Sequence, residues 1–100
     1  DEILIKLIIN NQRIVDFGYQ GKSCIYCQAT ASVLSNKLVN YKTIKIEELC
    51  DYAETYFGEN HKNLRKEWIF LNKLLSQKNA SRQQCILLPF NALRKIVSNL

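Results

Sequence analysis

Three places in this 100-residue sequence carry side chains that can bind a metal ion or act as nucleophiles. Asp1 supplies a carboxylate, Cys24 follows a turn that contains glycine, and Cys85 lies three residues after Arg82. Zn²⁺ accepts thiolate and carboxylate ligands, and thiolates also hold iron–sulfur clusters. The three positions therefore make a suitable ligand set for zinc, and they fall where regular elements are expected to begin.

Cys24 and Cys85 each come just before a predicted helix. Backbone N–H groups and the positive end of the helix dipole lower the pKa of a thiol at such a position and stabilise its thiolate. Arg82 would place a positive charge near Cys85, where it would stabilise a thiolate or a persulfide. We therefore expect Cys24 and Cys85 to be reactive thiols, with a lesser supporting role for Arg82.

Cys24 and Cys27 form a Cys-x-x-Cys pair whose spacing alone leaves three interpretations open. A thioredoxin-like redox pair requires a strand–helix–strand order, and no later strand is predicted. A structural zinc knuckle normally adds a second pair of cysteines or histidines, whereas Cys85 stands alone. In the third interpretation one of the two cysteines is packed in the helix. Cys50 lies in an amphipathic stretch and is expected to be a buried helical residue.

The composition is that of a single globular domain. Hydrophobic residues make up 47% and charged residues 23% of the 100 residues, which suffice for one modest core. No apolar run approaches the roughly 20 residues needed to span a bilayer, and no secretory signal pattern is present. We therefore expect reduced thiols, no membrane partner and a cytoplasmic location.

The net charge of +5 does not by itself indicate a nucleic-acid partner. The basic residues are scattered along the chain rather than gathered in one stripe. Aromatic residues are not interleaved with them on a strand face, as they are on many RNA-binding surfaces. We therefore expect no nucleic-acid partner.

The first 20 residues are predicted to form a β-hairpin. Residues 2–9 are rich in branched aliphatic side chains, and their alternation would place one set on the same side, namely Ile3, Ile5, Leu7 and Ile9. The Asn10-Asn11 pair favours a turn, because asparagine tolerates left-handed backbone angles. Residues 13–19 then supply the second strand.

Four helices are predicted to follow the hairpin. Apolar residues recur at helical spacing from Cys27 to about residue 40, over residues 46–57, and from residue 64 to residue 75, where Trp68 is expected in the core. A polar loop is expected over residues 78–84, and Pro89 suits the first turn of a final helix. This order predicts an α+β domain in which about four helices cover one face of a small antiparallel sheet.

Three motifs occur in a particular order along the chain. They are the apolar strand that begins with Asp1, the segment of residues 14–32 around Cys24, and the Arg-x-x-Cys-x-x-Leu pattern of residues 82–88. This order resembles the NifU-like/IscU-like family of iron–sulfur cluster assembly scaffolds. In that family the aspartate of a Cys-Gly-Asp motif precedes the strand, and the central cysteine opens a Cys-Ala-Ile-Ser-x-Ala-Ser-Ala-Ser stretch.

The resemblance implies a function and a set of ligands. Gln84, where the IscU type has histidine, looks like the SufU type, which accepts persulfide sulfur from a cysteine desulfurase (SufS-like) and passes it on toward downstream apo iron–sulfur proteins. Asp1, Cys24 and Cys85 would bind Zn²⁺ or a transient iron–sulfur cluster, with both cysteines as candidates for the persulfide. Cys27, where the family usually has a small serine, would be structural. The resemblance leaves open whether the protein is a sulfurtransferase-type acceptor or a passive scaffold.

The chain departs from the family at its start. The family's first cysteine, its sulfur acceptor, lies two residues before the aspartate, whereas this sequence begins at Asp1 and contains no methionine. We therefore expect residues 1–100 to be one domain of the NifU-like N-terminal type that lacks an upstream segment with this cysteine. The alternative is a non-catalytic protein-interaction domain with structural cysteines. Thiol accessibility separates the two, because structural cysteines are buried.

Overall fold

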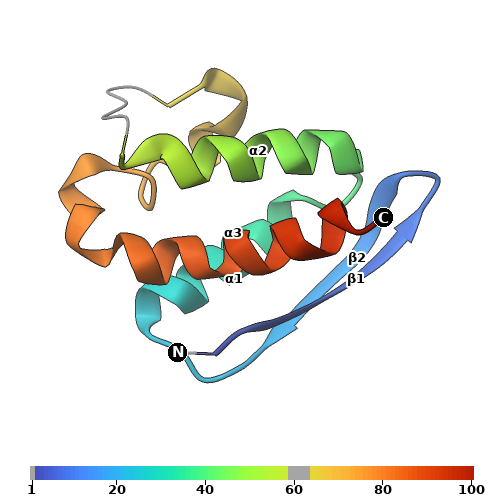
Figure 1. The fold of residues 1–100 in the computed structure, drawn as a ribbon, viewed down its shortest axis with the longest axis horizontal. Helices are drawn as coiled ribbons and strands as arrows, with labels where there is room; N and C mark the ends of the chain where they lie inside the picture. Colours follow the sequence, from blue (N-terminus) through green and yellow to red (C-terminus); the bar gives the residue numbers. More distant parts are fainter. Residues whose placement is uncertain (1, 59–63) are drawn as a thin grey trace.

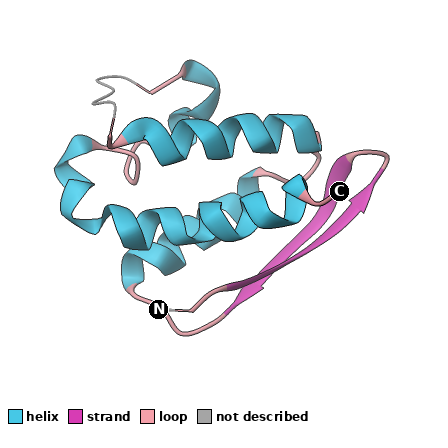
Figure 2. Cartoon of the chain, viewed as in Figure 1, coloured by secondary structure: helices cyan, strands magenta, loops and turns pink. Residues whose placement is uncertain are grey.

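A computed structural model describes residues 2–58 and 64–100 of the chain, so the predictions made for Asp1 lie outside the described residues. Figures 1 and 2 show a β-hairpin with the helices on one side of it. The predicted α+β class is thereby confirmed. In chain order the elements are β1 (Leu4–Asn10), β2 (Arg13–Gln20), α1 (Ile25–Lys37), α2 (Thr43–Tyr56), the 3₁₀ helices η1 (Lys66–Leu71) and η2 (Gln77–Arg82), and α3 (Gln83–Ser98).

The two strands form the antiparallel hairpin that the sequence predicts. Their register runs from Leu4 opposite Gln20 to Asn10 opposite Arg13, with an irregularity after Ile8. The turn lies one residue later than predicted, because Asn10 still pairs in β1. Asn11 and Gln12 both have positive φ, 52° and 64°, as a two-residue type I′ turn requires. Alternation then buries one face of the hairpin under the helices and leaves the other face exposed.

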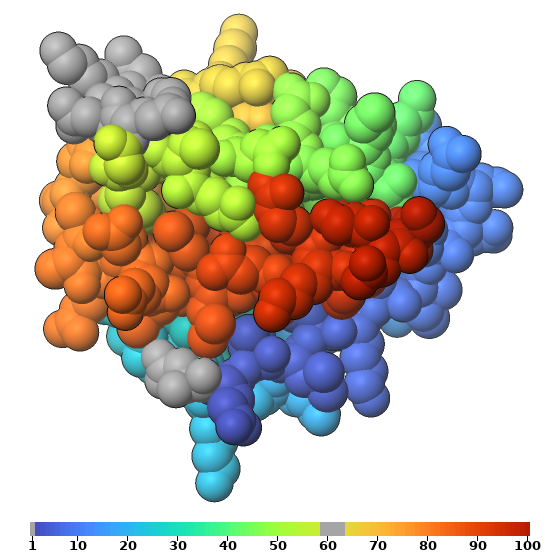
Figure 3. Space-filling model, viewed as in Figure 1, coloured from blue at the N-terminus to red at the C-terminus, as the bar shows by residue number. Residues whose placement is uncertain are grey.

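The core lies between the hairpin and the helices. Helix α3 packs against both α1 and α2, and the space-filling view shows α2 and α3 side by side across one face of the molecule (Figure 3). The largest fully buried side chains come from every layer, and Trp68 is among them, as predicted. This group also contains Ile14, Leu34, Leu38, Ile46, Leu49, Leu71, Leu75, Ile86, Phe90 and Leu93.

The third predicted helix is shorter than expected and has a different geometry. The structure forms only the 3₁₀ helix η1, in which Trp68 leaves helical angles at φ −117° and ψ 22°. These angles accompany a ring that lies 4.9 Å from the ring of Tyr52 and 4.3 Å below the Arg65 guanidinium. Successive tight turns bury residues at this spacing as well as an α-helix does, which is why the apolar pattern did not distinguish them.

The start of the last helix also differs from the prediction. The stretch expected to be a loop over residues 78–84 overlaps η2, which begins at Gln77. Helix α3 already begins at Gln83, so Pro89 lies inside the helix and beyond its first turn. The polar composition was misleading because Asn79 is buried, and its amide donates to the carbonyl oxygens of Lys73 and Leu74 at 2.8 and 3.2 Å. Pro89 is tolerated at the cost of one helical hydrogen bond.

Candidate functional site

Cys24 lies at the junction between the hairpin and the first helix. It is the N-cap residue of α1, with extended backbone angles of φ −70° and ψ 168°. The thiol makes no capping hydrogen bond, but the backbone N–H groups of Cys27 and Tyr26 point toward its sulfur and stabilise the thiolate. The pKa of Cys24 is therefore lowered, first by the Cys27 N–H and then by a hydrogen bond from the Cys85 thiol.

Cys85 lies in the first turn of α3, at the N-terminus of the last helix. Its thiol is hydrogen-bonded to Cys24, so two cysteines that are 61 positions apart in sequence meet at two helix N-termini. The pKa of Cys85 is raised. The largest cause is the hydrogen bond that its thiol donates to Cys24, and the next is its partial burial. When the pair carries a single negative charge, the thiolate therefore lies on Cys24 and the proton on Cys85.

Arg82 bridges the two helix N-termini. It is the N-cap residue of α3, and its guanidinium lies 5.6 Å from the centre of the Tyr26 ring in α1. Its positive charge lowers the pKa of both Cys24 and Cys85, although it is the smallest of the causes given for each thiol. A cation–π interaction with the Tyr26 ring holds the Arg82 guanidinium in this position.

The loop that carries Cys24 is held by contacts that sequence reasoning missed. The side-chain amide of Gln28 donates to the Gly21 carbonyl oxygen at 3.1 Å and to the Ser23 hydroxyl oxygen at 2.9 Å. On the other side the backbone N–H of Glu2 donates to the Lys22 carbonyl oxygen at 2.8 Å. The signal in the sequence was Gln28 itself, which lies one turn after the predicted start of the helix, where a polar side chain can bond back to the preceding loop.

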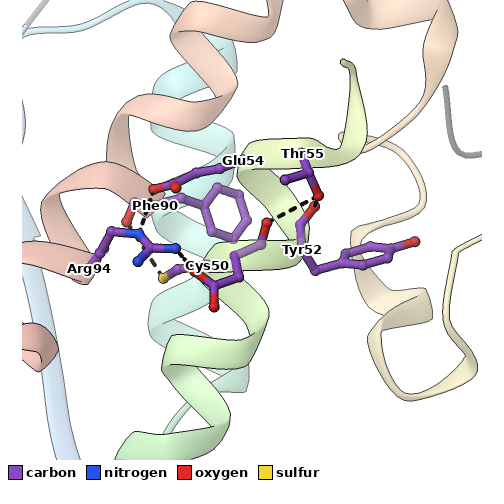
Figure 4. Close-up of polar contacts among 7 residues, drawn as sticks. Cys50, Tyr52, Glu54, Thr55, Phe90 and Arg94 are labelled. Atoms are coloured by element: carbon purple, nitrogen blue, oxygen red, sulfur yellow. Dashed lines mark hydrogen bonds and ion pairs between the residues drawn. The ribbon is translucent and has the colours of Figure 1, made fainter. Parts of the chain in front are cut away.

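Cys27 and Cys50 are both buried, as expected for cysteines that pack inside the helices. Both side chains are fully buried, and Cys27 packs inside α1, which is the third interpretation of the Cys-x-x-Cys pair. The Cys50 thiol donates to the Phe90 carbonyl oxygen at 3.6 Å beside the ion pairs of Arg94 (Figure 4). Burial raises the pKa of Cys50 to about 12, so this residue is a thiol at any physiological pH.

The described residues supply two of the three predicted ligands for a metal ion. Within residues 2–58 and 64–100, no three His, Cys, Asp or Glu side chains converge closely enough to hold a metal. Cys24 and Cys85 do converge, and two adjacent thiolates suit Zn²⁺ or iron. Glu2, which follows Asp1 in sequence, is bonded to the Cys24 loop. The structure therefore brings together two thiols whose chemistry suits a soft metal.

The thiol pair lies outside a groove between β1 and α3. The groove has a volume of about 330 Å³, and its walls are mostly apolar, with Asn91 and Lys95 among the lining residues. No cysteine lines it. In the part of the chain that the structure describes, no helix is long and apolar enough to cross a membrane. Cys24 and Cys85 themselves are partly exposed at the surface.

We expect Cys24 to be the first thiol that iodoacetamide modifies near neutral pH. Alkylation requires the thiolate, and a lowered pKa keeps Cys24 ionised until the pH falls through that lower value. Cys85 should need a higher pH, because its pKa is raised, and Cys50 should remain unmodified in the folded protein. Short alkylation pulses over a pH series, followed by peptide mass mapping, measure this order. Labelling of Cys85 or Cys50 ahead of Cys24 would contradict the assignment of the thiolate.

Comparison with known proteins identifies the fold. The crystal structure of a nitrogen-fixing NifU-like protein (N-terminal) from Brucella abortus matches with a TM-score of 0.83 at 18% identity, over 96% of this chain and 67% of that chain. A crystal structure of a hypothetical protein matches with a TM-score of 0.76 at 20% identity, over 96% and 71%. No protein-family pattern and no curated protein matches the sequence. The chain therefore has the fold of a NifU-like N-terminal domain.

Proposed function

We propose that this protein takes part in iron–sulfur cluster assembly, as a scaffold or as a zinc-dependent sulfur acceptor of the SufU type. The observation that carries the proposal is the hydrogen-bonded thiol pair Cys24–Cys85 at two helix N-termini. The NifU-like fold supports it as well, since the NifU-like family that the sequence resembles consists of iron–sulfur cluster assembly scaffolds. Gln84, where the IscU type has histidine, favours the SufU type within this class.

In this proposal Asp1, Cys24 and Cys85 would hold Zn²⁺ or a nascent iron–sulfur cluster. A bound metal would supply positive charge that keeps both thiolates deprotonated. The residues of the chain itself have separate tasks: Gln28 holds the Cys24 loop, and Arg82 lies near both sulfurs. Cys24 and Cys85 are both candidates for the sulfur acceptor, and the lowered pKa of Cys24 favours its thiolate.

The partners proposed for this site are a cysteine desulfurase, which would deliver persulfide sulfur, and apo iron–sulfur proteins, which would receive the product. The partly open position of both thiols supports direct docking of such proteins over the site. Reactive thiols persist where disulfides do not form, which is consistent with the reducing cytoplasm as the proposed location.

The alternative, a non-catalytic interaction domain with structural cysteines, is less well supported. Structural cysteines are buried and inert, as Cys27 and Cys50 are. Cys24 and Cys85 are partly exposed instead. Backbone N–H groups and the Arg82 charge also lie around the Cys24 sulfur, and packing alone does not require this arrangement.

Zinc binding tests the proposal. Titration of the reduced chain with Zn²⁺ should show about one tight site, and Cys24→Ser or Cys85→Ser should weaken it at least about 100-fold, beyond the 10- to 100-fold typical of losing a group behind a ligand. Cys27→Ala is the matched control and should bind like the parent. Calorimetry gives the affinity, and reconstitution with ferrous iron and sulfide under anaerobic conditions tests for a cluster. If the parent chain takes up neither zinc nor a cluster, the proposal is wrong.

A further inference from the structure

The groove between β1 and α3 is a second surface of the molecule, separate from the thiol pair. We propose that it binds an extended segment of a partner protein, in which apolar side chains are followed by a carboxylate group. The apolar side chains fill the groove, the backbone of the segment runs along the edge of β1, and the carboxylate pairs with Lys95. This inference goes beyond the proposed function, because none of the residues that line the groove is a cysteine.

The groove follows one edge of β1. Ile3, Leu4 and Ile5, at the start of the strand, all line it. Successive side chains of a strand point to opposite faces, and Leu4 is 49% exposed whereas Ile5 is buried. A groove that contacts both faces must run along the edge between them. Its other lining residues come from α3 and none from β2, so this edge is the one that faces away from β2.

The backbone of β1 offers hydrogen bonds on this edge. Within residues 2–58 and 64–100, β1 pairs with β2 alone. The Glu2 N–H donates to the Lys22 carbonyl oxygen at 2.8 Å, and the same register continues into β1. Because bonded and non-bonded positions alternate along an antiparallel ladder, Ile3 and Ile5 direct their N–H and C=O groups away from β2. An extended segment can pair with such groups as an added strand.

Helix α3 supplies the apolar wall on the other side, and Figure 3 shows it beside the start of β1. Leu88, Ala92 and Ile96 recur every four residues, so they lie on one face of the helix and line the groove together. They span about 12 Å at 1.5 Å per residue, which is the length of about three to four residues of an extended chain. The groove therefore matches a short extended segment in length.

Lys95 gives the groove a positive charge. It and Asn91 are the polar side chains of the lining, and both are exposed. In the part of the chain that the structure describes, no carboxylate forms an ion pair with Lys95. An ammonium group beside an apolar groove favours a carboxylate on the occupant, and the net charge of +5 adds a longer-range attraction. The same net charge disfavours a second copy of this chain as the occupant.

Binding of short peptides to the chain tests the proposal. The probes are fluorescein-labelled heptapeptides with amidated C-termini, in which three positions vary among leucine, isoleucine, valine and phenylalanine and are followed by two aspartates. We expect members of this set to bind with a Kd below about 100 μM, as measured by fluorescence anisotropy. Replacing the two aspartates by lysines should weaken binding at least about tenfold, because the ion pair with Lys95 is lost.

Variants of the chain locate the binding site. Lys95→Glu should weaken binding of the aspartate peptides at least about tenfold and should instead bind the lysine peptides. Lys73→Glu is the matched control, since it makes the same change of charge at an exposed lysine outside the groove. Ala92→Phe should also weaken binding, because the larger side chain would occupy the groove. Circular dichroism checks that each variant is folded.

Several results would overturn the inference: no aspartate peptide binds, the lysine peptides bind equally well, or Lys73→Glu weakens binding as much as Lys95→Glu does. Sedimentation equilibrium examines the other occupant, because a dimer that dissociates on Ala92→Phe assigns the groove to a second copy instead. The outcome is also separate from the proposed function. A chain that binds zinc but no peptide refutes only this inference, whereas one that binds peptide but neither zinc nor a cluster refutes only the assembly function.

Discussion

Gly21→Ala is expected to destabilise the protein by at least about 1–3 kcal/mol, the usual cost of a strained backbone conformation. Gly21 has φ +145°, where side chains are rarely accommodated, and a Cβ there would clash with the Glu2 carbonyl oxygen and lie 3.0 Å from the Ile3 Cα. Both neighbours are backbone atoms, so relief requires the start of β1 to move. The midpoint of urea unfolding, followed by circular dichroism, measures the loss.

The same substitution should also disturb the thiol pair. The Gly21 carbonyl accepts the hydrogen bond from Gln28 that holds the Cys24 loop, so a displaced loop should slow the alkylation of Cys24. Gly18→Ala is the matched control, because a Cβ at Gly18 meets nothing within 4 Å, and its effect should stay within about 0.5 kcal/mol. Equal destabilisation by the two alanines would show that the close approach at Gly21 is not a constraint.

Trp68→Ala is expected to be the most destabilising single substitution in the core, at about 3–5 kcal/mol. The side chain is only 1% exposed, and its ring contacts the tilted ring of Tyr52 at 4.9 Å between centroids and lies 4.3 Å below the Arg65 guanidinium. Truncation would leave a cavity between η1 and α2 that these neighbours cannot fill.

Ile69 provides the control for this prediction. It is adjacent to Trp68 in η1 but 55% exposed, so Ile69→Ala should change the unfolding free energy by no more than about 0.5 kcal/mol. Thermal unfolding should be followed by circular dichroism, since Trp68 is the only tryptophan and its loss removes the fluorescence signal. A small effect of Trp68→Ala would mean that η1 does not contribute to the core.

The hairpin and the α-helices could be predicted because local patterns determine them. Alternation in the strands, asparagine at the turn and helical spacing in α1, α2 and α3 each carry information within a short window. The 3₁₀ helices η1 and η2 could not be predicted in this way. Their form depends on contacts between distant residues, such as Trp68 with Tyr52.

The candidate site was predictable only in part. Helix N-termini marked Cys24 and Cys85 as activated thiols, but periodicity cannot bring residues 24 and 85 together, and only the family resemblance implied that they share a site. The close approach of Gly21 to Glu2 is a contact between two loops that no local pattern encodes. The hydrogen bonds of Gln28 depend on that same loop conformation.

The orientation of the hairpin has a consequence for how the molecule opens. Its turn lies near the C-terminus of the chain, whereas its open end, closed by the bond from Glu2 to Lys22, adjoins the start of α1 (Figure 1). Fraying of a two-stranded ribbon starts at the end that no turn connects. Amide hydrogens near Leu4 and Gln20 should therefore exchange with solvent earlier than those near Asn10 and Arg13. The part of the sheet that opens most easily therefore lies next to Cys24, at the start of α1.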